Sequence, residues 1–531
     1  MLKKENIMKI KYIACLIGLV FLGSCDDFLE EEPLSELSSD QFFSEPDQAF
    51  SAVNSLYRNG APQMTDGGVY SGTPLMLGAY MSGFFTNEYA GQELHVSNTQ
   101  QLTLNGDNIG TYLQDRWREL YLGISRANNA IKYIPETPEL TDAQRNQLLA
   151  EAKFFRAFSY YYLVRWFGPV PLTTEPYESL EDLYLEKSSI ADIYALIEAD
   201  LTEALGQGNL PKTSMVDNGK RVTAGAVATL LADVYLTMSG NPLNADRYAD
   251  AATLAQDIIN GEYGSYALVQ HDEVEGAVDL ENSAYNKLRK GDASTSEDIY
   301  IKEYDPEIGT AVYARYSYPV ALASEVLYDI TNGAYQPSSQ FLDFYDPTED
   351  LRAQERQFFH STYVPTGQTF ETAPFFWHDD TAIFETARSG KDFAVYTYAD
   401  VLLIAAEAIA KSSGVNADAV DYLAQVRGRA YWSTDESTIT SQLSGLSADA
   451  FVEEVWKERH RELVFEFRNW FDIVRTGQFP VSNAPGSISF VSAVGHTTEN
   501  GKQIESKHML LPLPGPELQR NPSLGTDNNG Y

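Results

Sequence analysis

The chain has 531 residues and a formal net charge of −37, from 38 Lys and Arg against 75 Asp and Glu. An electric field of that sign repels nucleic acid and anionic lipid, which excludes both as ligands of the folded part. A hydrophobic content of 44% is ample for folding, and one core serves this length only if it is elongated, as in a stack of helix pairs. The 33 Tyr side chains suit polar ligands with apolar faces, although most of them are expected to pack inside.

The N-terminus carries an export signal. An apolar run over residues 13–22 follows two lysines and is too short to span a bilayer, which predicts a secretory signal peptide over residues 1–24. The run ends in Leu-Gly-Ser before Cys25, which resembles a bacterial lipobox. This resemblance implies cleavage before Cys25 and lipid acylation of that residue; an ordinary signal followed by a chance Cys is the alternative.

Apolar residues at three- and four-residue spacing predict a series of helices. Residues 151–172 are apolar on nearly every face, so other helices must surround this one. Gly168 and Pro169 end it, and its Arg156 and Arg165 are placed to stack on aromatic rings or to bind a carboxylate. The other predicted helices span residues 41–58 (with Pro46 as an alternative start), 111–134, 188–205, 223–238, 244–260, 398–410, 417–430 and 448–476.

Successive helices with short links look like tetratricopeptide units. We therefore predict a mostly α fold, in which tetratricopeptide-like helix pairs form one elongated domain over residues 25–531 with long irregular insertions. Residues 60–110 and 264–393 lack a helical period and predict long loops, and the aromatic content of the second stretch argues against disorder. Residues 510–531 contain four prolines and predict an extended strap over the surface.

Six blocks, in order along nearly the whole chain, resemble the SusD/RagB family of outer-membrane glycan-binding lipoproteins. One block alone would be weak evidence, whereas six in order are specific. The blocks are the lipobox with Asp27-Phe28-Leu29, Phe155-Arg156-Ala157-Phe158 through Pro171-Leu172, Arg221-Val222-Thr223, Tyr398-Ala399-Asp400 through Arg429-Ala430, Glu458-Arg459 with Trp470-Phe471-Asp472, and Leu511-Pro512-Leu513-Pro514 with the terminal Gly530-Tyr531.

The resemblance implies an N-terminal SusD-like part over about residues 25–240, a C-terminal SusD/RagB part over about residues 264–531, and no catalytic activity. It implies that the protein captures an oligo- or polysaccharide and delivers it, as a lid, to a SusC-like TonB-dependent outer-membrane transporter. Acidic residues at 26–32 are usually a solvated tether. In Bacteroidetes-like lipoproteins such a run resembles a surface-export signal, so we expect display on the cell surface through a lipid at Cys25.

Sugar rings present C–H faces and hydroxyl edges, so a glycan site needs exposed aromatic rings beside fixed polar groups. The resemblance places such rings in the two aperiodic stretches. We predict the glycan-binding residues there, with Trp377 on a Pro-bounded loop as the first choice, and packing inside the protein is the alternative for each. The candidates are Trp377, His378, Phe85, Asn87, Tyr89, Tyr304 and Tyr316.

Other functions are weighed against glycan capture. A binder of peptides or glycopeptides could use the same fold, and a less favoured alternative is an α-helical glycoside hydrolase, since 75 carboxylates offer chance pairs. Because neither zinc-ligand spacing nor a Gly-rich phosphate loop occurs, we expect no cofactor. Asp343, Asp346 and Asp350 could hold a calcium ion, but a solvated loop is favoured there.

Overall fold

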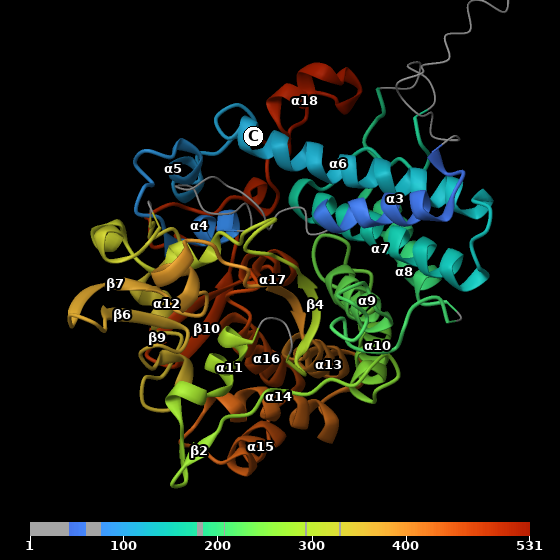
Figure 1. The fold of residues 1–531 in the computed structure, drawn as a ribbon. Coiled ribbons are helices and arrows are strands. Elements are labelled where there is room, and N and C mark those ends of the chain that lie inside the picture. Colours follow the sequence, from blue (N-terminus) through green and yellow to red (C-terminus); the bar gives the residue numbers. More distant parts are fainter. Residues whose placement is uncertain (1–41, 60–75, 178–183, 207, 292–294, 329–330) are drawn as a thin grey trace, which may run out of the picture.

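The computed structural model describes residues 42–59, 76–177, 184–206, 208–291, 295–328 and 331–531. The predicted signal peptide and Cys25 lie outside these residues. Long helices fill the right side and the lower centre of the view in Figure 1, and short strands and turns lie at the left. The predicted, mostly α fold is confirmed.

Helix α7 (Asp142–Phe167) is the longest of the N-terminal helices described, and it forms the centre of that half. It begins with a capping box, in which Thr141 and Gln144 each accept a hydrogen bond from the other's backbone N–H. It ends at Gly168, whose φ of 71° lies in the region that glycine adopts without strain. Nearly all side chains from residue 150 to residue 167 are buried, which confirms the predicted packing on every side.

Helices that follow one another in sequence pack against one another, as predicted for helix pairs. Helix α7 contacts α6 before it and α8 after it, and α9 contacts α10. Ser189 and Thr223 cap α8 and α9. These helices are α3 (Pro46–Asn59), which begins at the alternative start, α6 (Gly110–Tyr133), α8 (Ile190–Ala204), α9 (Ala224–Met238) and α10 (Tyr248–Ile259).

Two arginines of α7 take the two roles that the sequence suggests. Arg156 binds Asp200 of α8 through Nε and Nη2, each 2.7 Å from a carboxylate oxygen. The Arg165 guanidinium lies 3.7 Å from the ring centre of Tyr161 and 4.0 Å from that of Phe471. Arg156 therefore ties α7 to α8, and Arg165 ties it to the C-terminal helices.

The C-terminal helices differ from the prediction at one place. Residues 448–476 form two helices, α16 (Ala448–Glu462) and α17 (Asn469–Thr476), where one was expected. Between them Phe467 has a φ of 58°, which a right-handed helix cannot contain, and its ring packs on Phe393. Tertiary packing thus overrides the helical period. The other helices here are α13 (Tyr398–Ser413), α14 (Ala417–Ala430) and α15 (Glu436–Ser444), of which the periodicity does not predict α15.

The aperiodic stretches hold short elements. Where residues 60–110 were expected to be loops, the described part contains α4 (Leu77–Ser82) and α5 (Leu94–Gln100). In the stretch from 264 to 393, which we call the insertion, strands pair antiparallel in twos, and strand β8 leads directly into α13. Strand β1 (Phe85–Thr86) of the first stretch pairs with β5 (Gln336–Pro337) of the insertion. The other pairs here are β2 (Glu273–Val274) with β3 (Ala277–Val278), β4 (Asp298–Lys302) with β8 (Phe393–Thr397), and β6 (Phe359–Tyr363) with β7 (Gln368–Pro374), and the insertion also holds α11 (Ala284–Lys290) and α12 (Ser339–Leu342). After α17, β9 (Gln478–Ala484) pairs with β10 (Ser487–Ser492).

Residues 510–531, which we call the strap, run over α6 and α7. The N–H of Leu511 donates to the carbonyl of Trp166 (2.6 Å), and the Asn529 amide donates to that of Phe167 (3.0 Å), both at the end of α7. The strap includes helix α18 (Gly515–Arg520), which contacts α6. The strap is therefore fixed to the central helix.

A buried ion network joins the insertion to the C-terminal helices. The side chain of Arg352 is 0% exposed and binds Asp350, Glu458 and Glu462 at 2.6–2.8 Å. Glu462 of α16 also binds Arg429 of α14 at 2.5 Å. Burial alone would raise the pKa of Glu458, but the surrounding guanidinium groups, that of Arg352 first, hold this pKa at about 2. Glu458 is therefore ionised at neutral pH.

The substitution Arg352→Leu should destabilise the fold strongly, because it leaves buried carboxylates without their cation. We expect the free energy of unfolding to fall by about 3–5 kcal/mol, measured by urea denaturation. The control Arg388→Leu removes an exposed pair with Glu307 and should cost less than about 1 kcal/mol. Equal losses in the two variants would contradict the role of the network.

Candidate functional site

The structure buries most of the predicted binding residues. Trp377 keeps 3% of its surface exposed, and within the predicted set only Tyr89 is half-buried rather than buried. The exposure that we predicted for these side chains is wrong, because a ring inside the protein offers no face to a ligand. The buried members are Trp377, His378, Phe85, Asn87, Tyr304 and Tyr316.

Trp377 lies at the centre of an aromatic cluster. Its ring centre is 5.0 Å from that of Phe465, 5.1 Å from Tyr313 and 5.2 Å from Tyr335. Phe85 stacks on the same Tyr335, with ring centres 3.7 Å apart and planes 11° apart. The two aperiodic stretches therefore pack their aromatic rings on one another, and they extend the core.

The remaining buried candidates also have packing roles. The Asn87 amide donates to the Tyr80 hydroxyl (3.2 Å), and its oxygen accepts from the N–H of Tyr89 (2.8 Å), which closes a local turn. Tyr304 and Tyr316 each pack edge-on against Tyr313. These contacts are made inside the protein, where Asn87, Tyr304 and Tyr316 are all buried.

His378 is held as a neutral core side chain. Its Nε2 lies 3.0 Å from Asp380 Oδ1, and its ring stacks on Phe375. Burial lowers the pKa of His378 even though Asp380 acts in the opposite direction. Its position beside Trp377 in sequence therefore does not make it part of an open site.

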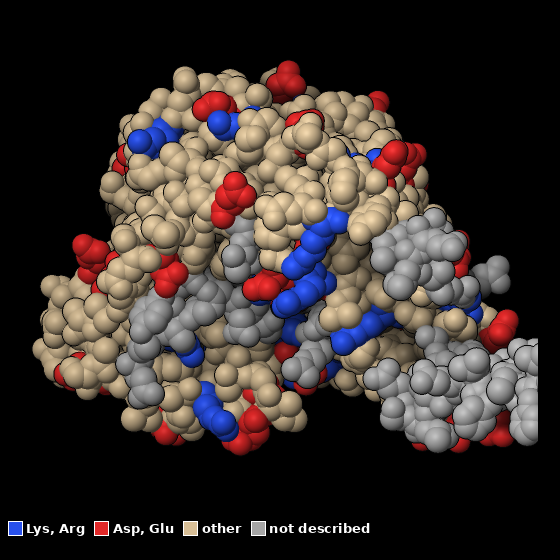
Figure 2. All heavy atoms as spheres, turned by 90° about the horizontal axis from the view of Figure 1, so that it is seen from above, with Lys and Arg blue, Asp and Glu red and all other residues tan. Residues whose placement is uncertain are grey.

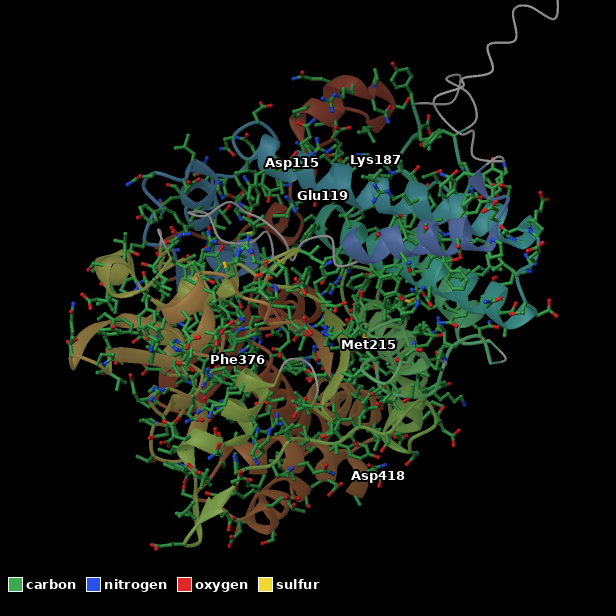
Figure 3. The ribbon with its side chains drawn as sticks, viewed as in Figure 1. Asp115, Glu119, Lys187, Met215, Phe376 and Asp418 are labelled. Carbon is green, nitrogen blue, oxygen red and sulfur yellow. The ribbon has the colours of Figure 1, made fainter. Side chains whose placement is uncertain are left out.

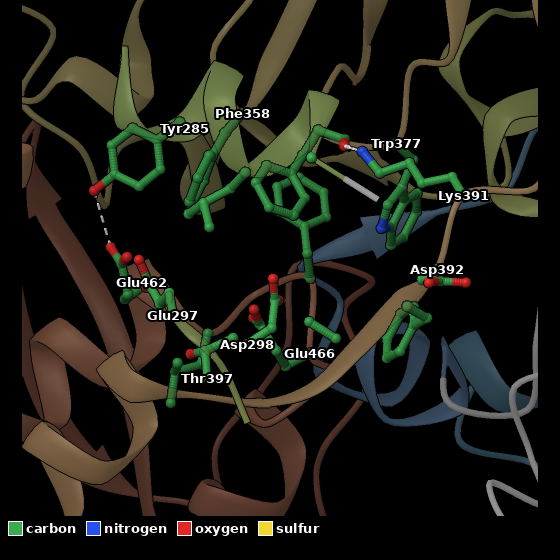
Figure 4. A pocket seen from close by; sticks show the side chains of 17 residues that line it. Tyr285, Glu297, Asp298, Phe358, Trp377, Lys391, Asp392, Thr397, Glu462 and Glu466 are labelled. Carbon is green, nitrogen blue, oxygen red and sulfur yellow. Dashed lines mark hydrogen bonds between the residues drawn. The ribbon is translucent and has the colours of Figure 1, made fainter. Parts of the chain in front are cut away.

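A small cavity of about 50 Å³ lies beside Trp377. Aromatic and acidic side chains both line it, and the carboxyl groups of Asp298 and Glu466 point into it on the side opposite Trp377 and Lys391 (Figure 4). Burial raises the pKa of Asp298 to about 6 and that of Glu466 well above its usual range. The space holds water-sized molecules, so it is too small for a sugar ring.

An open cleft of about 310 Å³ lies between α6, the segment after α7, and the strap. Tyr177 and Tyr184 line it and are 50% and 61% exposed, while Trp117 and Tyr121 of α6 line its base. Its volume lies within the range of small-ligand sites. We call it the tyrosine cleft.

Helix α6 and the segment after α7 are held together at the cleft. Trp117, Tyr121 and Asn128 share one face of α6, because they are spaced by four and seven residues. The Tyr121 hydroxyl donates to the carbonyl of Pro171 (2.8 Å), and the Asn128 amide donates to that of Thr173 (3.2 Å). The aromatic base and the wall that carries Tyr177 thus form one unit.

The strap supplies polar side chains on another side of the cleft. Glu517, Arg520 and Asn521 line it, and Glu175 lines the wall that follows α7. Arg520 Nη1 lies 2.8 Å from Glu517 Oε1. Exposed ring faces, hydrogen-bond donors and acceptors therefore meet in one concave site, which is the combination that a polar ligand with apolar faces requires.

Charged side chains of both signs lie on the face that carries α6 and α18, beside the cleft. Seen from the side of α6 and α18, Lys and Arg side chains gather near the middle of the face, and most Asp and Glu lie toward its edges (Figure 2). Lys187, Asp115 and Glu119 lie toward the top of the view in Figure 3, and Arg118 and Arg520 are mainly exposed.

Sequence reasoning places Trp117 and Tyr121 on one helix face but does not find the tyrosine cleft. The strap joins the segment of Tyr184 through residues more than 300 positions away, such as the bond from Asn521 to the carbonyl of Leu185. No local period encodes such a contact. The available signal is that two tyrosines follow α7 where helical spacing is lost.

Two further features bear on the site. No helix in the described ranges has both the length and the hydropathy that crossing a bilayer requires. The same residues contain no group of three or more His, Cys, Asp or Glu suited to a metal ion. Asp350, weighed above as a calcium ligand with Asp343 and Asp346, binds Arg352.

Comparison with known families finds two matching models. The model described as "SusD family" matches residues 368–531, and the model described as "Starch-binding associating with outer membrane" matches residues 27–236. Among curated proteins, SusD-like protein P2 of Formosa agariphila is 27% identical, and the alignment covers 98% of this chain and 99% of that protein. The similarity therefore extends over nearly the whole chain.

Solved structures share the fold. A SusD superfamily protein from Parabacteroides distasonis matches with a TM-score of 0.79 at 29% identity, covering 91% of this chain and 99% of that one. A laminarin-binding SusD-like protein matches with a TM-score of 0.66 at 22% identity, covering 92% and 100%. Surface glycan-binding protein A from Bacteroides thetaiotaomicron, in complex with laminarihexaose, matches with a TM-score of 0.69 at 18% identity, covering 91% and 100%.

Trp377→Ala should lower stability, because it leaves a hole in the aromatic cluster. We expect the free energy of unfolding to fall by about 3–5 kcal/mol in urea denaturation. Trp432, which is 37% exposed, provides the matched control, and Trp432→Ala should cost about 1 kcal/mol or less. A Trp377→Ala protein as stable as the control would show that the ring is not a core residue.

The cavity carboxyl of Asp298 should make stability fall as pH rises. Its pKa in the folded protein, about 6, lies above the ordinary value of 3.8, so the neutral form stabilises the fold below about pH 4 and this contribution is lost as pH rises through 6. We expect an effect of order 1–3 kcal/mol between about pH 4 and pH 7. Unfolding of wild type and Asp298→Asn at both pH values measures it, and identical pH dependence would refute the assignment.

Proposed function

Because this chain belongs to the SusD/RagB family, we propose that it binds an oligo- or polysaccharide and that the tyrosine cleft is the binding site. The observation that carries the proposal is the pair of exposed rings, Tyr177 and Tyr184, beside the polar side chains of the strap. A sugar ring would stack its C–H face on a tyrosine while its hydroxyls bond to Asn521 and the carboxylates. Such a site favours modest affinity, roughly micromolar to millimolar.

Structural relatives support the choice of a first ligand. One neighbour is described as laminarin-binding, and the Bacteroides thetaiotaomicron protein is in complex with laminarihexaose. Their identity to this chain is 22% and 18%, so they suggest a class of ligand to test. The side chains of this chain's own cleft determine which glycan linkage it binds. Laminarihexaose is the first probe, within a panel of oligosaccharides of different linkage.

The proposal includes a place in the cell. Removal of residues 1–24 would leave Cys25 as a lipid-bearing N-terminus, and the mature chain 25–531 would form a single SusD-like domain on the outer membrane. There it would act as the lid of a SusC-like TonB-dependent transporter and pass the glycan to it. The lipobox-like sequence and the family description that mentions the outer membrane support this placement. Co-purification of the transporter with the full-length lipoprotein from detergent-solubilised membranes tests it.

Capture without catalysis is the preferred form of this function. The alternatives are a surface binder of peptides or glycopeptides and, less favoured, a glycoside hydrolase that uses cleft carboxylates such as Glu175 and Glu517. Incubation with the oligosaccharide panel separates these cases. Binding of an oligosaccharide without new reducing ends supports capture, and release of shorter sugars supports a hydrolase. Binding of peptides without binding of oligosaccharides supports the peptide binder.

Tyr184→Ala should weaken glycan binding without lowering the melting temperature. We expect the dissociation constant for laminarihexaose, or for the best ligand of the panel, to rise about tenfold, equivalent to ~1.4 kcal/mol, because a stacking face is lost. Calorimetric titration measures it. Phe384, which is 38% exposed and does not line the cleft, provides the control Phe384→Ala. Unchanged affinity in Tyr184→Ala would remove the cleft from the site.

A further inference from the structure

Two walls of the tyrosine cleft are tied to each other at the segment that bears Tyr184. The Asn521 amide Nδ2 of the strap donates to the carbonyl of Leu185 (2.9 Å), and Lys187 Nζ donates to the carbonyl of Asp527 in the strap (3.0 Å). One bond runs in each direction between the two segments. The strap therefore holds Leu185 and Lys187, the first and the third residue after Tyr184.

Asn521 is fixed in the position that this contact requires. Its backbone N–H donates to the carbonyl of Glu517 at the end of α18 (2.9 Å). Its side-chain oxygen accepts from the N–H of Ser523 (3.0 Å), which begins the 3-10 turn η9 (Pro522–Leu524). The oxygen is thus committed to the strap, and the NH₂ group points across to Leu185. Asn521 also lines the cleft, so its side chain both bonds to the wall that follows Tyr184 and faces the space where a ligand would bind.

The strap itself is anchored away from the cleft. It is bound to the end of α7 through Leu511 and Asn529, and the N–H of Gly515 donates to the carbonyl of Gly106 (2.8 Å). The approach at Gly106 is so close that a Cβ there would lie 2.5 Å from the carbonyl oxygen of Leu513. Because these anchors do not involve Tyr184, the strap can act as a fixed support against which the Tyr184 segment is positioned.

We propose that the strap is a positioning element of the binding site, with Asn521 as the positioning residue that sets where Tyr184 stands in the cleft. This inference rests on the proposed function for its ligand, but the coupling between the two segments exists without one. Because such coupling is reciprocal, a ligand that stacks on Tyr184 stabilises the strap, and a loosened strap weakens the ligand. The strap thereby controls affinity through residues remote in sequence from the aromatic rings.

The substitution Asn521→Asp tests the proposal with almost no change in volume. The carboxylate keeps the acceptor for Ser523 N–H but loses the donor to Leu185, and two oxygens then face each other. The matched control is Asn209→Asp, whose amide likewise donates to a backbone carbonyl, that of Glu203, at the end of α8. A second variant, Lys187→Met, removes the other bond between the segments and retains the length of the side chain.

Hydrogen exchange followed by mass spectrometry provides the readout that needs no ligand. In Asn521→Asp and Lys187→Met, the peptide covering residues 184–190 should exchange about tenfold faster than in wild type, and in Asn209→Asp it should not change. The dissociation constant for laminarihexaose should rise about tenfold in the first two variants, with unchanged melting temperature. In wild type, laminarihexaose should slow exchange in residues 515–524 as well as in 184–190.

The outcomes separate this inference from the function on which it rests. Wild-type exchange over residues 184–190 in both Asn521→Asp and Lys187→Met would overturn the positioning role. Faster exchange in that peptide with unchanged affinity would also overturn it, because Tyr184 would then be free of the strap's influence on binding. If wild type binds no oligosaccharide of the panel, the proposed function fails, and the exchange comparison still decides whether the strap positions Tyr184.

Discussion

The contact between the helices and the insertion depends on the buried guanidinium of Arg352. It has no contact with solvent, and its charge is balanced by Asp350 in its own loop and by Glu458 and Glu462 on α16. A buried charge of this kind is tolerated only with its partners in place, so the loop and the helix cannot separate without a large cost. The network therefore specifies one arrangement of the insertion, which short two-stranded sheets alone would leave poorly determined.

Tyrosine explains how a long irregular insertion becomes part of the core. The insertion has few helices or wide sheets to satisfy its own carbonyl groups. Buried carbonyl groups at the break between α16 and α17 also need partners from outside the helices. The buried Tyr335 hydroxyl donates to the carbonyl of Val464 (3.0 Å), and that of Tyr345 donates to Arg461 (2.9 Å). The rings fill space as a phenylalanine would, and the hydroxyls satisfy carbonyl groups near the end of α16. The abundance of tyrosine thus reflects interior packing more than ligand binding.

Helices were predictable to within a few residues where one face is buried along the whole element. Thr223, Pro46 and Gly168 marked ends correctly because caps act locally. The break after Glu462 was not predictable, because the apolar period continues through it and only the packing of Phe467 against distant rings decides the backbone. The exposure of the candidate rings was not predictable for a related reason: an aromatic ring beside a polar residue has the same local pattern whether it faces water or, like Trp377, another part of the chain. Tyr184 became a candidate only through its exposure and its place in the cleft that the strap also lines.

The cleft is assembled from segments that are far apart in the order of synthesis. Its base on α6 and the wall with Tyr177 are made early, but Glu517, Arg520 and Asn521 belong to the final part of the chain. A polypeptide emerging from the ribosome therefore lacks a complete cleft until its last segment has docked on α7. The cleft therefore becomes complete only late in folding, after the strap has bound the end of α7.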